Sequence, residues 1–221
     1  YAYIEVEKFM SSFNPDTLVD NENKLFYQHA VNLYHFYEKK ISNEDLLCKI
    51  KKLINYPKIL KQLAFTEIEL LIISTLLDFI VDEQESKLLF DRLGEYLNDN
   101  RQAINISTTT TFNTILHRFA KYSGIQKNYD DVIKYCKIGI DRNLYQKSFY
   151  LSDYFHYFSA LASYRLEKFE DYAYHLAQCY TVIQYEGNIR KMQKFTNLIN
   201  VDFNIEFKDF VLEYLKQNKE E

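Results

Sequence analysis

The chain has 221 residues, of which 47% are apolar and 26% charged, so it is long enough to bury a sizeable core. Aromatic residues make up 17%, which excludes disorder as the main state. With 4 Gly and 2 Pro it is too poor in turn formers for an all-β or an α/β fold, which leaves an all-α protein. The formal charge of −4 lacks the basic excess of a nucleic-acid-binding surface.

The N-terminal third has an apolar period of about 3.6, which predicts helices. We expect a short helix over 4–13, stopped by Pro15, and a second helix over 23–40. Ser42 and Asp45 form a capping-box pattern for a third helix, which should end before Pro57. The densest basic stretch lies here, and its helical spacing indicates a solvated helix face: Lys49, Lys51, Lys52, Lys58 and Lys61.

Thr66 and Glu69 form a second capping-box pattern, which opens the most apolar predicted helix, over 67–81. Ser, Thr and Asp interrupt its apolar run, which is also too short to span a bilayer. The acidic residues at 82, 83 and 85 should begin another helix, ending in the Asn-Asp-Asn cluster at 98–100. The polar, β-branched segment 107–111 is predicted to be a linker.

The second half contains an internal repeat. The segments 128–131 and 168–171 recur with a period of 40, and each connects an aromatic-rich helix (112–126, 148–166) to a following helix (129–142, 170–185). Helix pairs at a fixed period predict an α-solenoid. We therefore expect a single helical-repeat domain over 1–221, with N-terminal helices (1–65), a first helix pair (66–106), further repeats (112–203) and a C-terminal capping helix (204–221).

The turns of this repeat resemble those of tetratricopeptide repeats. Tyr129-Asp130-Asp131 and Phe169-Glu170-Asp171 have the aromatic and the two acidic residues expected between the paired helices, and Tyr164 and Ala173 match further positions. The period of 40 is longer than the usual 34, no Trp occurs, and no Pro closes a unit. The sequence thus predicts degenerate tetratricopeptide-like helix pairs.

Degenerate repeats of this length resemble the C-terminal sensor region of the Rgg/GadR/MutR family of transcriptional regulators. The resemblance rests on the opening Ile4-Glu5-Val6-Glu7-Lys8-Phe9, the helix over 66–82 and the last two repeats. It implies a Gram-positive intracellular receptor that binds a short peptide pheromone, forms homodimers and contacts DNA through an N-terminal helix-turn-helix domain. Because the chain starts at Tyr1 rather than Met, we expect a fragment that lacks this domain.

Two sets of polar residues, here called ladders, occupy equivalent positions in the first helix of successive repeats, one period of 40 apart. They are Asn113, Asp153 and Gln193, and His117, Tyr157 and Asn197. Such side chains in a concave groove could bind an extended peptide backbone, and Arg190 could meet a peptide carboxylate. Equally, polar residues recur by chance on solvent-facing surfaces. The 20 Tyr suit a wet groove or a dimer interface, but AT-rich codon usage accounts for them as well.

The sequence offers no pattern for catalysis or metal binding. It contains no HExxH, GxSxG or phosphate-cradling Gly-rich loop, and we interpret His156 and His175 as packed, hydrogen-bonded histidines. Cys48, Cys136 and Cys179 form neither a disulfide framework nor a zinc site and indicate a reducing cytoplasm. We expect no enzyme activity, no cofactor, no metal and no membrane association. The alternative function is a tetratricopeptide-like adaptor that docks a protein partner and has no DNA-binding domain.

Overall fold

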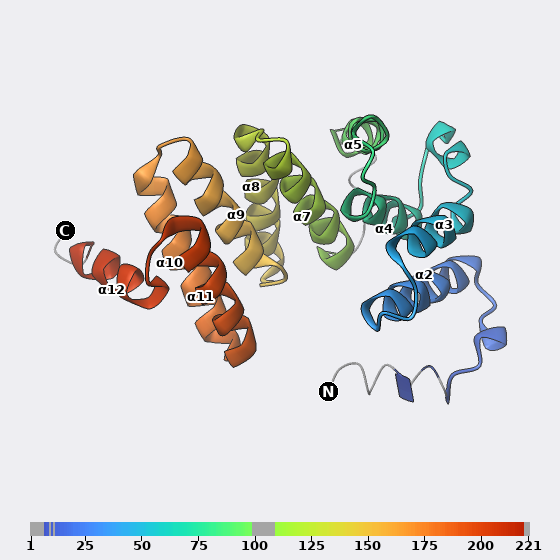
Figure 1. The fold of residues 1–221 in the computed structure, drawn as a ribbon, viewed down its shortest axis with the longest axis horizontal. Coiled ribbons are helices and arrows are strands. Elements are labelled where there is room, and N and C mark those ends of the chain that lie inside the picture. The colour runs from blue at the N-terminus through green and yellow to red at the C-terminus, as the bar shows by residue number, and fades with distance from the viewer. Residues whose placement is uncertain (1–6, 9, 11, 99–108, 219–221) are drawn as a thin grey trace. The chain divides into compact units, whose positions relative to one another are not determined.

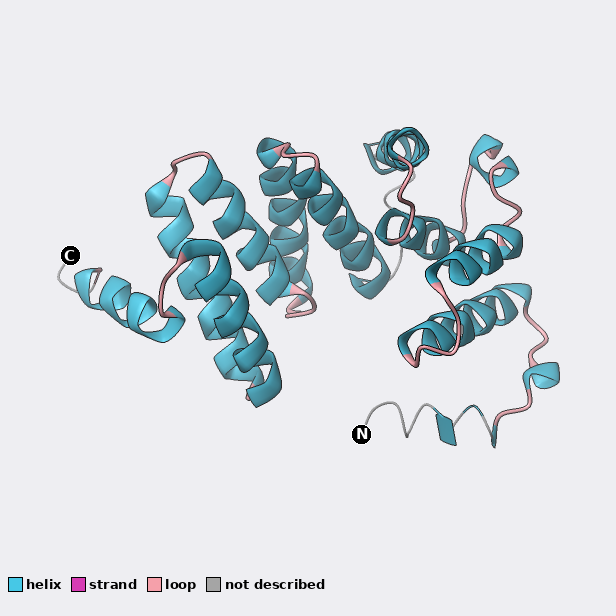
Figure 2. Ribbon diagram, viewed as in Figure 1, coloured by secondary structure: helices cyan, strands magenta, loops and turns pink. Residues whose placement is uncertain are grey.

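A computed structural model describes residues 7–8, 10, 12–98 and 109–218 of the chain (Figure 1). Ten α-helices and no β-strand occur within these ranges, which confirms the all-α prediction (Figure 2). The chain divides into two compact units, residues 1–105 and 106–221. Among the helices described, none combines the length and the hydrophobicity needed to cross a bilayer.

The first unit contains four described α-helices with short 3-10 segments between them. The α-helices are α2 (Asn21–Tyr37), α3 (Asn43–Leu53), α4 (Glu67–Thr75) and α5 (Glu83–Asn98), and the 3-10 segments are η1 (Pro15–Thr17), η2 (Lys58–Lys61) and η3 (Leu76–Asp78). Helix α2 packs against α3 and α4, and α5 contacts η3. Of the helix predicted over 4–13, residues 7, 8, 10 and 12 are helical, Phe13 is not, and the rest lie outside the described residues.

Both predicted capping boxes are present. The Ser42 hydroxyl accepts from the Asp45 backbone N–H at 3.1 Å, and the Ser42 N–H donates to the Asp45 carboxylate at 3.2 Å. Thr66 and Glu69 make the equivalent pair of bonds at 3.2 and 2.8 Å. These bonds satisfy donors that the first helical turn leaves unpaired, which is why α3 and α4 begin where the sequence predicts.

Helix α4 is shorter than predicted. It ends at Thr75 and continues as η3, whereas the apolar run suggested one helix to Val81. The hydroxyls of Ser74 and Thr75 both donate to the carbonyl of Leu71 at 2.9 Å, which competes with the helical hydrogen bonds. The Thr75 hydroxyl also lies 3.2 Å from Nε2 of the buried His29, which fixes this break against α2.

The second unit contains six described α-helices. They are α7 (Thr109–Ile125), α8 (Tyr129–Gln146), α9 (Ser152–Arg165), α10 (Phe169–Glu186), α11 (Ile189–Phe203) and α12 (Phe207–Gln217). Helix α7 starts earlier than predicted, because Thr109–Thr111 are helical rather than a linker; residues 107 and 108 lie outside the described ranges. Thr111 and Phe112 are buried, so packing outweighs the weak helix propensity of the threonines.

The sequence period of 40 is visible in the backbone. Helices α8 and α10 both have 18 residues, and their first residues, Tyr129 and Phe169, are one period apart. Residues in the left-handed conformation also recur at this spacing. Lys127 and Glu167 follow α7 and α9, and Lys147 and Gly187 follow α8 and α10. The sequence repeat therefore corresponds to a repeat of turn geometry.

The helices of the second unit pack against their neighbours in sequence, and α7 with α9 and α10 with α12 also make contact. Helix α9 contacts α7, α8 and α10, and α10 also contacts α11 and α12 (Figure 1). The core between them contains the fully buried rings of Phe155, Phe195 and Phe207. Helices α7 and α9, which are not consecutive in the sequence, are therefore adjacent in the fold.

Candidate functional site

The adjacent helices α7 and α9 form a face at which aromatic side chains meet. The His117 ring lies 5.0 Å from Tyr154 and 5.2 Å from Phe158, measured between ring centroids. All three side chains are only partly buried. On each helix, residues three or four positions apart lie on the same side. The face that contains these three residues therefore runs along both helices.

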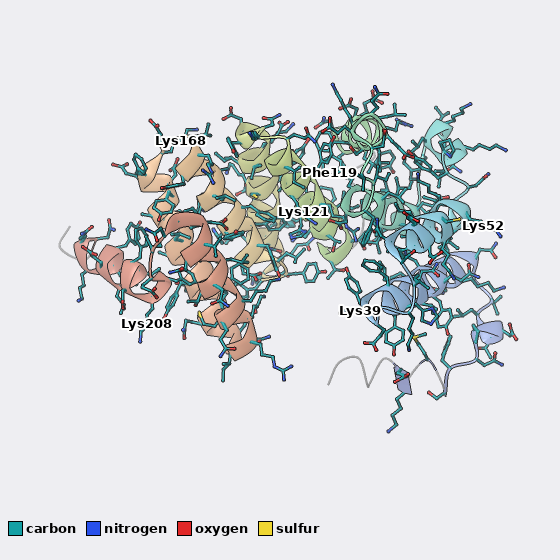
Figure 3. All side chains as sticks on the ribbon, in the orientation of Figure 1. Lys39, Lys52, Phe119, Lys121, Lys168 and Lys208 are labelled. Atoms are coloured by element: carbon teal, nitrogen blue, oxygen red, sulfur yellow. The ribbon has the colours of Figure 1, made fainter. Side chains whose placement is uncertain are left out.

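One end of this face is a depression of about 310 Å³, here called the α7–α9 pocket. Its volume is within the range of small-ligand sites, roughly 300–1,000 Å³. It is mostly apolar, with two cationic side chains, and no acidic residue in the described part of the chain lines it. The lining residues are Ala120, Lys121, Gly124, Ile125, Tyr129, Val132, Phe158, Leu161, Ala162 and Arg165. Lys121 and Arg165 are both exposed, and Lys121 is labelled on α7 in Figure 3.

The other end of the face is polar. The Lys194 ammonium of α11 donates to the Tyr154 hydroxyl at 2.6 Å and lies 5.1 Å from the centre of that ring. Beside it, the hydroxyls of Thr114 and Tyr150 are 3.1 Å apart. From Tyr154 to Arg165 the helix rises by about 16 Å at about 1.5 Å per residue. At about 3.3 Å per residue, an extended peptide of about five residues would cover that distance.

Three residues of the predicted ladders are buried and bind other protein groups. Asn113 is fully buried, and its amide donates to the Asn143 side-chain oxygen at 2.7 Å. Asp153 is fully buried and lies 2.9 Å from the Lys191 ammonium; burial raises the pKa of this carboxyl group. The buried Tyr157 donates its hydroxyl to Asp202, and burial raises the pKa of that phenol. Their part in peptide binding stays a prediction.

The other four predicted residues are accessible but are not gathered in one place. His117 lies on the α7–α9 face, whereas Arg190, Gln193 and Asn197 are exposed on α11. Gln193 lines a separate depression of about 190 Å³ beside Gly187 and Met192. The structure thus brings His117 together with residues that the sequence did not single out for this site.

The sequence did not point to Lys121, Phe158, Arg165 or Lys194, and it included Tyr154 only among the many Tyr that suit a wet groove or a dimer interface. A signal for part of this set existed, because Thr114, Tyr154 and Lys194 are themselves related by the repeat period. The predicted ladder began one position earlier, at Asn113. A step of one residue turns the side chain by about 100° around a helix, which moves it from this face into the core.

A pair of histidines lies on α9 and α10, outside the α7–α9 face. Nδ1 of His156 and Nδ1 of His175 are 3.0 Å apart, as expected for a packed, hydrogen-bonded pair. Burial, with the neighbouring His175, lowers the pKa of His156 to about 3, and burial also lowers the pKa of His175. Nowhere in the described ranges do three or more His, Cys, Asp or Glu residues gather in a way that could hold a metal ion.

A larger depression of about 520 Å³ lies between α2 and α3 in the first unit. It too has two lysines, Lys49 and Lys52, together with a mixed polar and apolar lining: Tyr27, Gln28, Val31, Asn32 and Leu53. This α2–α3 depression is the rival location for a ligand. It provides a matched control for any experiment on the α7–α9 pocket.

Comparison with known proteins identifies no relative of this chain: no family model, curated protein or solved structure matches it. Its function is therefore argued from the residues and the geometry of the site.

Proposed function

We propose that this chain is the regulatory domain of an Rgg/GadR/MutR-type transcriptional regulator, which binds a short peptide and mediates homodimerisation in the cytoplasm. In this proposal the second unit is an α-solenoid of degenerate tetratricopeptide-like helix pairs, and DNA is bound by a separate N-terminal domain. The recurrence of the α8 and α10 boundaries and of their turns at the period of 40 supports the repeat. The sequence resemblance to the family supports the regulatory role.

The observation that carries the proposal is the α7–α9 face itself. It combines exposed cations, partly buried aromatic rings and an apolar pocket over a length that suits about five extended residues. Aromatic rings with a polar edge are well suited to a ligand that has both apolar side chains and a polar backbone. An elongated ligand, rather than a compact metabolite, fits such a face best.

A peptide bound here would contact α7 and α9 at the same time, and Lys194 would add a contact from α11. Because it would touch three successive repeats, its affinity would depend on how these helices are spaced. Binding would therefore favour the arrangement of the helices for which the peptide has the higher affinity. The size of this shift is set by the difference between its affinities for the alternative arrangements. This is the physical means by which a peptide would change the arrangement of a dimer and of attached DNA-binding domains.

The proposal is tested by fluorescence anisotropy with a pool of fluorescein-labelled pentapeptides made of apolar and neutral polar residues. Saturable binding to the wild-type chain is expected, and Gly124→Val should weaken it by adding bulk to the pocket lining. The first carbon of the new side chain has room, because a Cβ at Gly124 meets only Val132, at an ordinary 3.7 Å. Thermal unfolding of the variant checks that it remains folded.

The regulator and the adaptor are separated by two further measurements. A dimeric mass in solution, together with a helix-turn-helix domain encoded upstream of Tyr1, is expected for the regulator. A monomer that binds no pentapeptide would contradict the peptide-sensor proposal and favour the protein-docking adaptor.

A further inference from the structure

We propose that the paired histidines of α9 and α10, His156 and His175, form a binding site for one divalent cation of the late first-row transition series, with Cu²⁺ bound most tightly. The two rings supply nitrogen ligands from two different helices, and water in the adjacent pocket completes the coordination. This inference is independent of the proposed peptide-binding function, because the histidine pair lies outside the α7–α9 face.

The spacing of the two nitrogens suits neighbouring ligands of one metal ion. The Nδ1 atoms of His156 and His175 are 3.0 Å apart. Metal–histidine bonds are about 2.0–2.1 Å long, so nitrogens at this separation subtend an angle of about 95° at a shared ion. Tetrahedral coordination would need them about 3.3 Å apart at the same bond length. A right angle is typical of tetragonal sites, which Cu²⁺ and Ni²⁺ prefer, so the spacing favours these ions over Zn²⁺.

Both rings are in a protonation state that can bind a metal. Burial lowers the pKa of His156 and of His175, so both imidazoles are neutral at pH 7, as metal ligation requires. In the hydrogen-bonded pair one of the two Nδ1 atoms carries a proton, and binding requires that proton on Nε2 of the same ring instead. The ring stays neutral in this change of tautomer. The Nδ1 lone pairs then converge on the ion through rotation about χ2, which is a soft torsion in histidine.

The pair opens onto a pocket that gives an ion access and holds water. This pocket, of about 290 Å³, is lined by residues of α8, α9 and α10, including both histidines and the hydroxyl-bearing Ser159 and Tyr174. A water molecule takes about 30 Å³ of liquid volume, so the pocket has room for several. Lys137 also lines it, but its ammonium lies 3.1 Å from the Asp141 carboxylate, which offsets its repulsion of a cation.

The site has two protein ligands and positions left for water. Within the described ranges no third His, Cys, Asp or Glu joins the pair in a way that could hold a metal ion. The affinity should therefore be that of a two-nitrogen chelate, below that of a closed structural site with four protein ligands. Because each ring comes from a different helix, the ion would link α9 to α10 and stabilise the folded chain.

The experiment measures metal binding to the whole chain by isothermal titration calorimetry and by thermal unfolding, with CuCl₂, NiCl₂ or MgCl₂ at pH 7.5. The proteins are the wild type, His156→Gln, His175→Gln and the control His35→Gln, which changes a histidine of α2 in the first unit. Electron paramagnetic resonance of the Cu²⁺ complex counts the nitrogen ligands. Unfolding of each metal-free variant checks that it is folded.

The wild type should bind one Cu²⁺ through two histidine nitrogens. At roughly 100 times its Kd, Cu²⁺ should raise the unfolding midpoint by about 5–10 °C, and chelation with EDTA should reverse the rise. Ni²⁺ should bind less tightly, and Mg²⁺, which prefers oxygen ligands, should not bind. His156→Gln and His175→Gln should each weaken Cu²⁺ binding at least about tenfold, whereas His35→Gln should bind as the wild type does.

Four outcomes would overturn this inference. They are no saturable Cu²⁺ binding by the wild type, full binding by either His156→Gln or His175→Gln, loss of binding in His35→Gln, and a Cu²⁺ spectrum with fewer than two histidine nitrogens. If one of the two pair variants fails to fold, the other variant and the nitrogen count in the wild type decide. None of these outcomes bears on peptide binding at the α7–α9 face.

Discussion

Gly139 in α8 allows α8 and α9 to approach closely, and its replacement by Ala should destabilise the second unit. A Cβ at this position would lie 2.4, 2.5 and 2.8 Å from three ring carbons of Phe155. Non-bonded carbon atoms normally stay about 3.5–4.0 Å apart. The Phe155 ring is fully buried, so it has no solvent to move into.

Two effects oppose each other in Gly139→Ala. Ala gains about 1 kcal/mol over Gly in a helix interior. Overpacking a core typically costs about 1–3 kcal/mol, and three contacts this short put the site at about 3 kcal/mol. We therefore expect a net loss of about 2 kcal/mol in the free energy of unfolding. With an m-value of about 2 kcal/mol/M, the urea midpoint should fall by about 1 M.

The assay is urea unfolding followed by circular dichroism, with Gly124→Ala of α7 as the matched control. A Cβ at Gly124 meets only a Val132 methyl at 3.7 Å, so that variant should gain up to about 1 kcal/mol from helix propensity. Replacing Phe155 by Leu in the Gly139→Ala background should remove part of the clash, so the two changes should cost less together than the sum of their separate effects. Equal or higher stability of Gly139→Ala would refute the packing argument.

Three further predictions concern buried polar groups. Asn113→Ala removes the donor to Asn143 and should lower the free energy of unfolding by about 1–3 kcal/mol in urea; lost peptide binding with an unchanged midpoint would instead make Asn113 a ligand residue. In the folded chain the pKa of His156 is lowered to about 3, whereas in the unfolded chain a histidine has a pKa near 6.5. Between pH 3 and pH 6.5 the unfolded chain therefore binds more protons at this residue than the folded chain does. The free energy of unfolding of the wild type should thus fall by about 2 kcal/mol from pH 7 to pH 5, and that of His156→Gln should fall less. The same pH dependence in both proteins would contradict this. Lys191→Met leaves the buried Asp153 carboxylate without its ion pair and should cost about 3 kcal/mol, most of which Asp153→Asn should recover in the double variant; no recovery would argue against the pair.

The helix positions were largely predictable because their signals are local. The hydroxyl and carboxylate of a capping box belong to the same helical turn, so Ser42 with Asp45 and Thr66 with Glu69 mark helix starts without any tertiary information. The break after Thr75 was not predicted, although part of its cause is local, because the hydroxyls of Ser74 and Thr75 bond to the Leu71 carbonyl. The other part is tertiary: His29 is 46 residues away in the sequence and meets the Thr75 hydroxyl only in the folded unit.

The side-chain directions within the repeat were less predictable. A period of 40 locates equivalent residues but does not say which of them face the core. Asn113 and Thr114 are neighbours in α7, yet Asn113 is fully buried against Asn143 while the Thr114 hydroxyl meets that of Tyr150. The distinction requires knowing where α8 and α9 pack around α7, which depends on contacts between distant residues.

The α7–α9 pocket had a sequence signal of a different kind, namely small residues. Ala120 and Gly124 are one helical turn apart on one face of α7, and Ala162 lies opposite on α9. Side chains this short leave space between the two helices, and the pocket of about 310 Å³ lies there. Apolar surface that stays open to solvent contributes nothing to the stability of the chain, so a ligand that covers it would gain the burial free energy that the protein's own side chains leave unused.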